Sequence, residues 1–294
     1  MTDGTERSQR IELRCGEIVG LRAANPGPFT LEGTNTWILG RQPAWLIDPG
    51  PPLAQHLEAV TAELRARGGP GAILLTHSHG DHAGALGAIR AHFPHAPVAM
   101  GLPAGPAAGG VRAGTVPAGD ERRPGDLVLA HGARVGPLRA FATPGHASDH
   151  FAFIAGDVAF TGDAVLGVGS VFIAPEPGAL RSYLEALMAL RNEPLELICP
   201  GHGPVVEKPA EKLEEYIAHR RSRERALLVA LAEGRRTVAE LLASAWADVP
   251  RELLPAAAVT LAAHLDKLDE EGRLPAGVER PRAWRELLHG AAAP

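Results

Sequence analysis

The segment Thr76–His82 has the sequence THSHGDH and concentrates side chains that can bind a metal ion. Four of its residues are candidate ligands, namely His77, His79, Asp81 and His82. Because side chains alternate along an extended chain, His77 and His79 are expected on one side, and the chain can then bend at Gly80. Imidazole nitrogens and carboxylate oxygens suit zinc, and also iron or manganese. Four ligands exceed the needs of one open site, so the segment predicts two adjacent metal ions.

Three more candidate ligands follow later in the chain, each on a glycine-containing turn directly after a predicted strand. They are His146, Asp163 and His202. The apolar run 72–75 likewise places the first cluster after a strand of the kind that is buried on both faces. Glycine lets a backbone turn approach an ion closely, and such loops commonly carry functional groups. The shared context predicts that these side chains meet in one site.

The pattern H-x-H-x-D-H, followed by single His, Asp and His residues at strand ends, resembles the metallo-β-lactamase superfamily of binuclear metallohydrolases. The resemblance covers roughly residues 11–220. It implies an α+β fold, a four-layer αββα sandwich with the site on one edge. It also implies two sets of metal ligands, with His77, His79 and His146 on one ion, Asp81, His82 and His202 on the other, and Asp163 bridging the two.

The bridging aspartate separates this chain from the antibiotic-degrading members of that superfamily, which do not use one. One group of those enzymes has a cysteine there, whereas Cys15 and Cys199 of this chain fall outside the ligand positions. A bridging carboxylate holds two ions close together, which suits phosphodiester or thioester hydrolysis. We therefore expect β-lactam hydrolysis to be absent or very slow.

The expected mechanism follows from the two ions. Water that bridges two cations loses a proton near neutral pH, because the metals stabilise hydroxide. This metal-bridging hydroxide would attack the substrate, so no serine or cysteine nucleophile is needed. Asp81 is the candidate catalytic residue, placed to orient the hydroxide and accept its proton.

Two further residues are candidates for supporting the ligands from behind. In the superfamily that the chain resembles, the aspartate at the position of Asp48 supports the ligand loop, although an aspartate before Pro-Gly also suits a plain turn. His150 lies four residues past His146 and could orient a ligating imidazole, as such partners commonly do.

Predicted elements place these residues. Strands are expected over 11–22, 34–47 and 127–163, and helices over Leu53–Arg67, Ala83–His92 and Pro177–Arg191. The N-terminus of the helix that starts at Ala83 would favour anionic substrates. Residues 101–126 are rich in Gly, Pro and Arg and predict a loop, which either shapes the substrate cleft or is a simple surface excursion.

The C-terminal part predicts a separate module. A long helix over 209–232, a short helix with a capping box from Thr237, a helix over about 251–270 and a short strand after Gly272 describe a winged helix. It resembles the module appended in one lactamase-like subgroup, some members of which are endoribonucleases. We expect domains over 1–232 (catalytic) and 233–294 (winged helix).

Charge argues for a packing role of this module. Its charge is nearly balanced, whereas phosphate binding normally needs a basic stripe. A role beside the cleft or in a homodimer contact is therefore favoured over nucleic-acid binding, and the arginine-rich run 220–225 is interpreted as a solvated helix face.

Function is predicted as binuclear metal-dependent hydrolysis with two divalent ions, zinc first and manganese or iron as alternatives. The resemblance favours phosphodiesters of single-stranded RNA; the alternative is a thioester hydrolase of the glyoxalase II kind, with a small-molecule ester as substrate. An iron-dependent oxidoreductase and a non-catalytic nucleic-acid-binding protein are less favoured.

The remaining features concern location. The first ten residues lack the apolar core of a secretion signal, and no apolar run is long enough to span a bilayer. Two cysteines far apart do not indicate a disulfide framework, and the net charge of −5 gives no overall attraction to nucleic acid. We therefore expect a cytoplasmic protein with no membrane partner.

Overall fold

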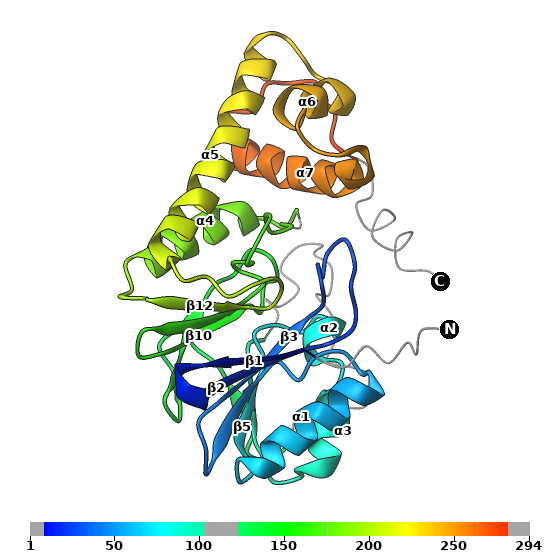
Figure 1. The fold of residues 1–294 in the computed structure, drawn as a ribbon. Helices are drawn as coiled ribbons and strands as arrows, with labels where there is room; N and C mark the ends of the chain where they lie inside the picture. Colours follow the sequence, from blue (N-terminus) through cyan, green and yellow to red (C-terminus); the bar gives the residue numbers. More distant parts are fainter. Residues whose placement is uncertain (1–8, 103–122, 174, 282–294) are drawn as a thin grey trace, which may run out of the picture.

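The computed structural model describes residues 9–102, 123–173 and 175–281, and these form two packed sheets, flanking helices and a helical C-terminal module (Figure 1). The first sheet has the order β1-β2-β3-β4-β5-β6-β7. Its strands are β1 (Gln9–Leu13), β2 (Ile18–Arg22), β3 (Asn35–Leu39), β4 (Ala44–Ile47), β5 (Pro70–Leu74), β6 (Val98–Met100) and β7 (Leu127–Val128). Pairing is antiparallel from β1 to β4 and parallel from β4 to β7.

The second sheet has the order β12-β11-β10-β9-β8. Its strands are β8 (Arg134–Val135), β9 (Leu138–Ala142), β10 (Phe151–Ala155), β11 (Val158–Gly162) and β12 (Leu197–Pro200). Only β11 and β12 pair in parallel, which brings the carboxyl ends of these two strands to the same edge of the sheet.

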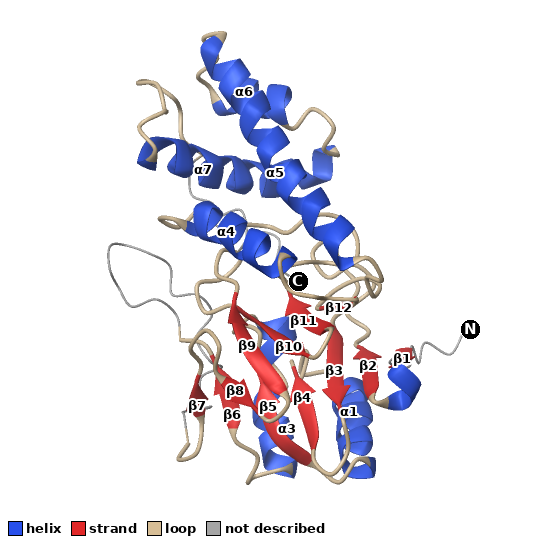
Figure 2. Ribbon diagram, turned by 90° about the vertical axis from the view of Figure 1, so that its left-hand side faces the viewer, coloured by secondary structure: helices blue, strands red, loops and turns tan. Residues whose placement is uncertain are grey.

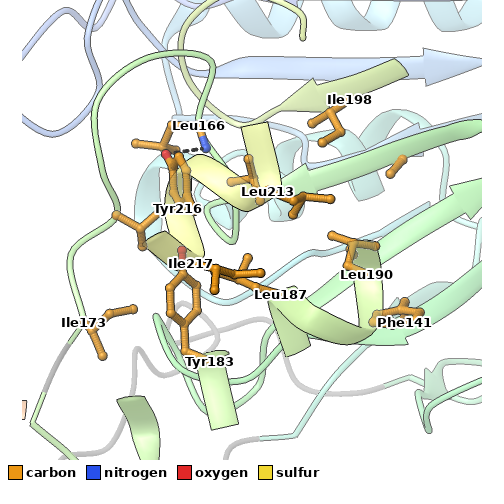
Figure 3. Close-up of a cluster of buried hydrophobic side chains, with 14 of the residues drawn as sticks. Phe141, Leu166, Ile173, Tyr183, Leu187, Leu190, Ile198, Leu213, Tyr216 and Ile217 are labelled. Atoms are coloured by element: carbon orange, nitrogen blue, oxygen red, sulfur yellow. Dashed lines mark hydrogen bonds between the residues drawn. The ribbon is translucent and has the colours of Figure 1, made fainter. Parts of the chain in front are cut away.

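Helices cover both outer faces of the sheet pair (Figure 2). The described helices are α1 (Ala54–Ala66), α2 (Gly80–Ala83), α3 (Leu86–His92), α4 (Ala179–Arg191), α5 (Pro209–Ala232), α6 (Val238–Ala245) and α7 (Leu254–Glu270), of which α6 and α7 lie in the C-terminal module. Apolar residues of α1 and α3, such as Leu64 and Ile89, pack on the first sheet. Those of α4 and α5, such as Leu187 and Ile217, pack on the second sheet (Figure 3).

Between the two sheets lies a third apolar layer, which contains Trp37 of β3 and Phe160 of β11. Their rings are 6.3 Å apart, and burying a side chain of this size contributes roughly 1.5–3 kcal/mol. The four layers are therefore helix, sheet, sheet and helix, so the expected αββα sandwich is confirmed.

The C-terminal module forms around the far half of α5. Leu227 and Leu231 of α5 pack against α6 and α7 in a separate apolar cluster, which includes Trp246 and Leu265. The capping box at the start of α6 is present, with Thr237 accepting from the Glu240 amide and the Glu240 carboxylate accepting from the Thr237 amide. Figure 1 shows α5 running from the sandwich into this module without a break.

Four expectations from the sequence need correction. The predicted strand over 11–22 is a hairpin, β1 and β2, because Arg14 and Cys15 adopt positive φ angles and turn the chain. The helix expected from Ala83 is split, and its first part already begins at Gly80. No strand lies within the described residues 271–281 after α7.

The fourth correction concerns the arginine run. Arg220 is only 2% exposed, so the run 220–225 is not uniformly a solvated face.

Of the predicted loop 101–126, residues 103–122 lie outside the described residues. No helix of the described chain combines the length and the apolarity that crossing a membrane requires.

Candidate metal centre

The candidate ligands gather at one edge of the sandwich because four strands end there. His77 and His79 follow β5, His146 follows β9, Asp163 follows β11 and His202 follows β12. Asp81 and His82 lie in the short helix α2, which turns them back toward the same point. The structure thus brings together all seven side chains that the sequence singled out, in groups whose ligand atoms lie within 4.8 Å of one another.

The first group contains three imidazoles. The Nε2 atom of His77 lies 2.9 Å from Nδ1 of His79, and Nε2 of His146 lies 3.0 Å from the same atom. Tetrahedral ligands at Zn–N distances of about 2.0–2.1 Å would be separated by roughly 3.3 Å. The three nitrogens are therefore spaced like the ligands of one ion.

The second group combines one carboxylate with two imidazoles. Nε2 of His82 lies 3.3 Å from Nε2 of His202, and Oδ2 of Asp81 lies 3.4 Å and 3.2 Å from these two nitrogens. Such close contact between two histidine nitrogens and a carboxylate oxygen again suits a shared cation.

Asp163 lies between the groups. Its Oδ1 is 3.3 Å from Nε2 of both His82 and His202, and its Oδ2 is 3.6 Å from Nε2 of His146. Oδ1 is buried and makes no hydrogen bond of normal geometry to the described residues. A buried carboxylate oxygen without a donor is costly unless a cation neutralises it, so this atom fits a metal-binding role.

Asp48 holds the ligand segment from behind, and its φ of 53° places it at a sharp turn after β4. Its Oδ1 accepts from the Thr76 amide at 2.7 Å, and its Oδ2 accepts from the Thr76 hydroxyl at 2.7 Å. Oδ2 also lies 2.8 Å from Nδ1 of His82. A proton on Nδ1 leaves the Nε2 lone pair of His82 free to face the site.

His150 contacts the backbone of the site. Its Nε2 accepts from the Asp163 amide at 3.2 Å, while its Nδ1 lies 2.7 Å from the Thr143 hydroxyl. The ring stacks on that of His77 with a centroid distance of 4.9 Å. His150 therefore contacts the Asp163 backbone and the His77 ring, and it is in none of the candidate ligand groups among the described residues.

The sequence did not point to several other groups that orient the ligands. Nδ1 of His146 lies 2.9 Å from the Phe172 carbonyl, and Nδ1 of His202 lies 3.3 Å from the Gly33 carbonyl. The Thr34 hydroxyl is 3.4 Å from Oδ2 of Asp81. Backbone carbonyls leave no trace in the residue types, and Thr34 is far from the ligands in sequence, so neither could be found from spacing.

The protonation states differ between the two groups. Burial lowers the pKa of His77 well below its ordinary value, and burial lowers that of His79 to about 4. Burial opposes charge on His82 as well, but neighbouring carboxylates outweigh it and raise the pKa. The same balance, with Asp163 as the main carboxylate, raises the pKa of His202 to about 9. The second group thus attracts positive charge, as a cation site should.

Comparison with known proteins places this arrangement in a family. The family model of the metallo-beta-lactamase superfamily matches residues 29–202, and that of the beta-lactamase associated winged helix domain matches residues 237–280. The chain is 32% identical over 271 residues to a Beta-lactamase-like protein 2 homolog of Caenorhabditis elegans, which covers 89% of this chain and 87% of the relative.

Two other similarities extend the comparison. The chain is 33% identical over 259 residues to the Atrochrysone carboxyl ACP thioesterase of Aspergillus chevalieri, covering 83% of this chain and 77% of that protein. A crystal structure of a metallo-beta-lactamase family protein from Thermus thermophilus superposes with a TM-score of 0.67 at 26% identity, covering 87% of this chain and 94% of that one. The chain therefore belongs to the metallo-β-lactamase superfamily of hydrolases and carries the winged-helix domain associated with it.

Proposed function

We propose that this superfamily hydrolase is a binuclear metalloenzyme that cleaves thioesters, with phosphodiesters of single-stranded RNA as the second candidate. The observation that carries the choice is the similarity to an acyl carrier protein thioesterase over 83% of this chain. This similarity puts thioesters before RNA phosphodiesters, whereas the sequence pattern favoured RNA. The earlier order depended on a subgroup resemblance alone.

Each candidate ligand has a proposed place. One ion would be held by His77, His79 and His146, and the other by Asp81, His82 and His202, with Asp163 between them. Two divalent ions, zinc in the first instance and manganese or iron as alternatives, supply a polarising charge and make bound water acidic near neutral pH.

Asp81 is the proposed catalytic carboxylate. Its side chain is 28% exposed, whereas those of His82 and His202 are 0% and 1% exposed, so Asp81 is the member of its group that substrate and solvent can reach. The Thr34 hydroxyl donates to Oδ2 at 3.4 Å, so Oδ1 is the proposed acceptor of a proton from attacking water.

Thioester chemistry matches the protein groups of this site. A thiol has a pKa of about 8.5, so a thiolate leaves without a proton donor. An alkoxide leaving group from a phosphodiester is far more basic and benefits from a general acid. The described ligands supply carboxylates of lowered pKa, such as Asp163, and no carboxylic acid among them is held protonated.

RNA cleavage remains the second candidate because a winged-helix domain is present, and such domains often bind nucleic acid. Most of the positively charged side chains described in the module form ion pairs, however. Ion pairs join Arg223 to Asp248, Arg235 to Glu233, Lys267 to Glu224, Arg273 to Glu271 and Arg280 to Asp266. Paired cations are poor phosphate ligands, so we propose that the module packs beside the sandwich and does not read RNA.

Parallel assays test the choice. Metal-loaded protein would be offered an acyl-carrier-protein thioester, single-stranded RNA and the β-lactam nitrocefin, with Asp163→Asn as the inactive control. We expect thioester hydrolysis and negligible turnover of nitrocefin. Efficient RNA cleavage that disappears in the Asp163→Asn variant, without thioester hydrolysis, would exchange the two candidates.

A further inference from the structure

Three side chains from α4 and α5 hold the loop that leads away from Asp163. The Tyr183 hydroxyl donates to the Ala164 carbonyl at 2.8 Å, and the Tyr216 hydroxyl accepts from the Leu166 amide at 3.1 Å (Figure 3). The third is Arg220, whose guanidinium donates to the Val171 carbonyl. The loop 164–173 is therefore fixed at its start, in its middle and near its end.

The end of this loop touches a candidate metal ligand. The carbonyl of Phe172, one residue after Val171, lies 2.9 Å from Nδ1 of His146. A proton on Nδ1 that is donated to this carbonyl leaves Nε2 of His146 to face His79 at 3.0 Å. Displacing the peptide between residues 171 and 172 would therefore turn the imidazole and change the first ligand group.

Arg220 is an unusual residue for this position. It is 2% exposed and stands 5.6 Å over the Tyr183 ring, and its Nε has no hydrogen-bond partner among the described residues. Burial accordingly lowers its pKa. A buried cation that forms no ion pair with a described carboxylate destabilises a fold, so the hydrogen bond to the Val171 carbonyl offers a reason for its presence.

We propose that Arg220 is a positioning residue for the metal centre, which holds the peptide between Val171 and Phe172 so that the Phe172 carbonyl orients His146. The inference rests on the metal centre proposed above and not on the choice of substrate. Because α5 continues into the C-terminal module and Ala263 of α7 packs into the same apolar cluster as Tyr216, the proposal also connects that module to the site.

The test uses the full chain and two matched substitutions. Arg220→Met removes the donor while keeping an unbranched side chain, and Arg221→Met makes the same change at the exposed neighbour, whose guanidinium lies 3.5 Å from the Met188 sulfur. Arg220→Lys restores a donor and a positive charge. For each variant, the affinity for each of two metal ions is measured by chelator competition, together with the visible spectrum of the Co²⁺ form and the melting temperature.

We expect Arg220→Met to bind one ion about 10–100-fold more weakly, the usual effect of losing a group that orients a ligand, with an altered Co²⁺ spectrum. Arg221→Met should match the wild type, and Arg220→Lys should recover most of the affinity. Wild-type metal affinity and spectrum in a folded Arg220→Met protein, even with a lowered melting temperature, would overturn the proposal.

Two further outcomes are informative. If Arg220→Met does not fold, Arg220→Gln decides, because it removes the guanidinium that donates to the Val171 carbonyl while keeping a polar side chain. A folded Gln variant that binds one ion more weakly supports the proposal, and one with wild-type affinity for both ions contradicts it. If the wild-type protein itself binds no metal, the proposed metal centre fails, and that result is distinct from equal affinities in wild type and variant.

Discussion

The two ligand groups lie side by side but differ in charge and in what holds them. His77, His79 and His146 form an all-imidazole group in which burial depresses the pKa values of His77 and His79. The group of Asp81, His82 and His202 contains one carboxylate and lies beside those of Asp163 and Asp48, and there the pKa values of both histidines are raised.

This difference shows how similar ligand types can be tuned by their surroundings. Asp48 stands directly behind His82 at 2.8 Å, whereas His146 is backed by a neutral carbonyl. In the absence of metal, His77 and His79 of the first group stay neutral, while His82 and His202 of the second group hold protons that a bound metal would have to displace. Four measurements can break or sharpen this contrast.

The largest effect is expected for Asp163→Ala, because Asp163 contacts both groups. Removing the shared carboxylate leaves two cations without the negative charge between them, so activity should fall by a factor on the order of 10³ or more and metal affinity should drop. Asp157→Ala, at an exposed residue paired with Arg14, is the control. Retention of both ions and of turnover in Asp163→Ala would remove this residue from the site.

Asp48→Asn should weaken the second group more than the first. The variant keeps the side-chain shape but withdraws the charge that faces Nδ1 of His82, which should lower metal affinity there about 10–100-fold. Asp48 reaches the first group indirectly, through Thr76, whose hydroxyl lies 3.0 Å from Nδ1 of His77, so this group should change less. Chelator competition measures the affinity for each ion in Asp48→Asn and in the control Asp157→Asn. An equal loss of affinity at the two groups would contradict the proposed difference between them.

Metal binding should release more protons from the second group than from the first. The pKa of His202 is raised to about 9, so this imidazole is protonated at neutral pH in the metal-free protein and must lose its proton to bind an ion. The pKa of His79 is lowered to about 4, so this imidazole is already deprotonated at neutral pH. Affinity at the second group should therefore fall as pH drops below about 9, while protons should not compete for His79 until about pH 4.

Calorimetric titration in buffers of different ionisation enthalpy counts these protons. The ion at the second group should bind with release of about one proton or more, and the ion at the first group with release of fewer protons. The same proton count for both ions would show that the two groups are electrostatically alike.

The smallest effect is expected for Thr34→Val. The hydroxyl contacts Asp81 at 3.4 Å, a long hydrogen bond, and no metal ligand changes. A decrease of several-fold in kcat with unchanged metal content is expected, since losing a weak orienting bond amounts to about 1 kcal/mol. Thr61→Val, where the buried hydroxyl has no partner among the described residues, should leave kcat unchanged. A wild-type kcat in the Thr34→Val enzyme would show that the Thr34 contact does not help to orient Asp81.

Much of the fold and the candidate ligands could be read from local patterns. The strands β3, β4 and β5 follow from short apolar runs, and α1 follows from helical spacing, because each pattern reports burial of one segment. The segment Thr76–His82 predicted a metal site because four candidate ligands lie within six residues after a strand. The domain boundary near residue 232 stays a prediction.

The breaks in regular structure were not predicted. The hairpin between β1 and β2 depends on positive φ angles at Arg14 and Cys15. These residue types rarely adopt positive φ angles, so the sequence did not predict the turn. The wing strand expected after Gly272 is absent from residues 271–281, because a short apolar pair in a glycine- and proline-rich segment does not specify a strand without a pairing partner.

The supporting contacts around the ligands come from packing between distant segments. Arg220 stands in an arginine-rich run that resembles any exposed helix face, and only the packing of α5 on the second sheet buries this arginine and leaves Arg221 outside. Phe172 contributes a backbone carbonyl, which every residue type possesses. Ligand identity is a property of side-chain chemistry and is therefore written in the residues, whereas ligand orientation depends on which distant groups the fold brings within about 3 Å, the range of a hydrogen bond.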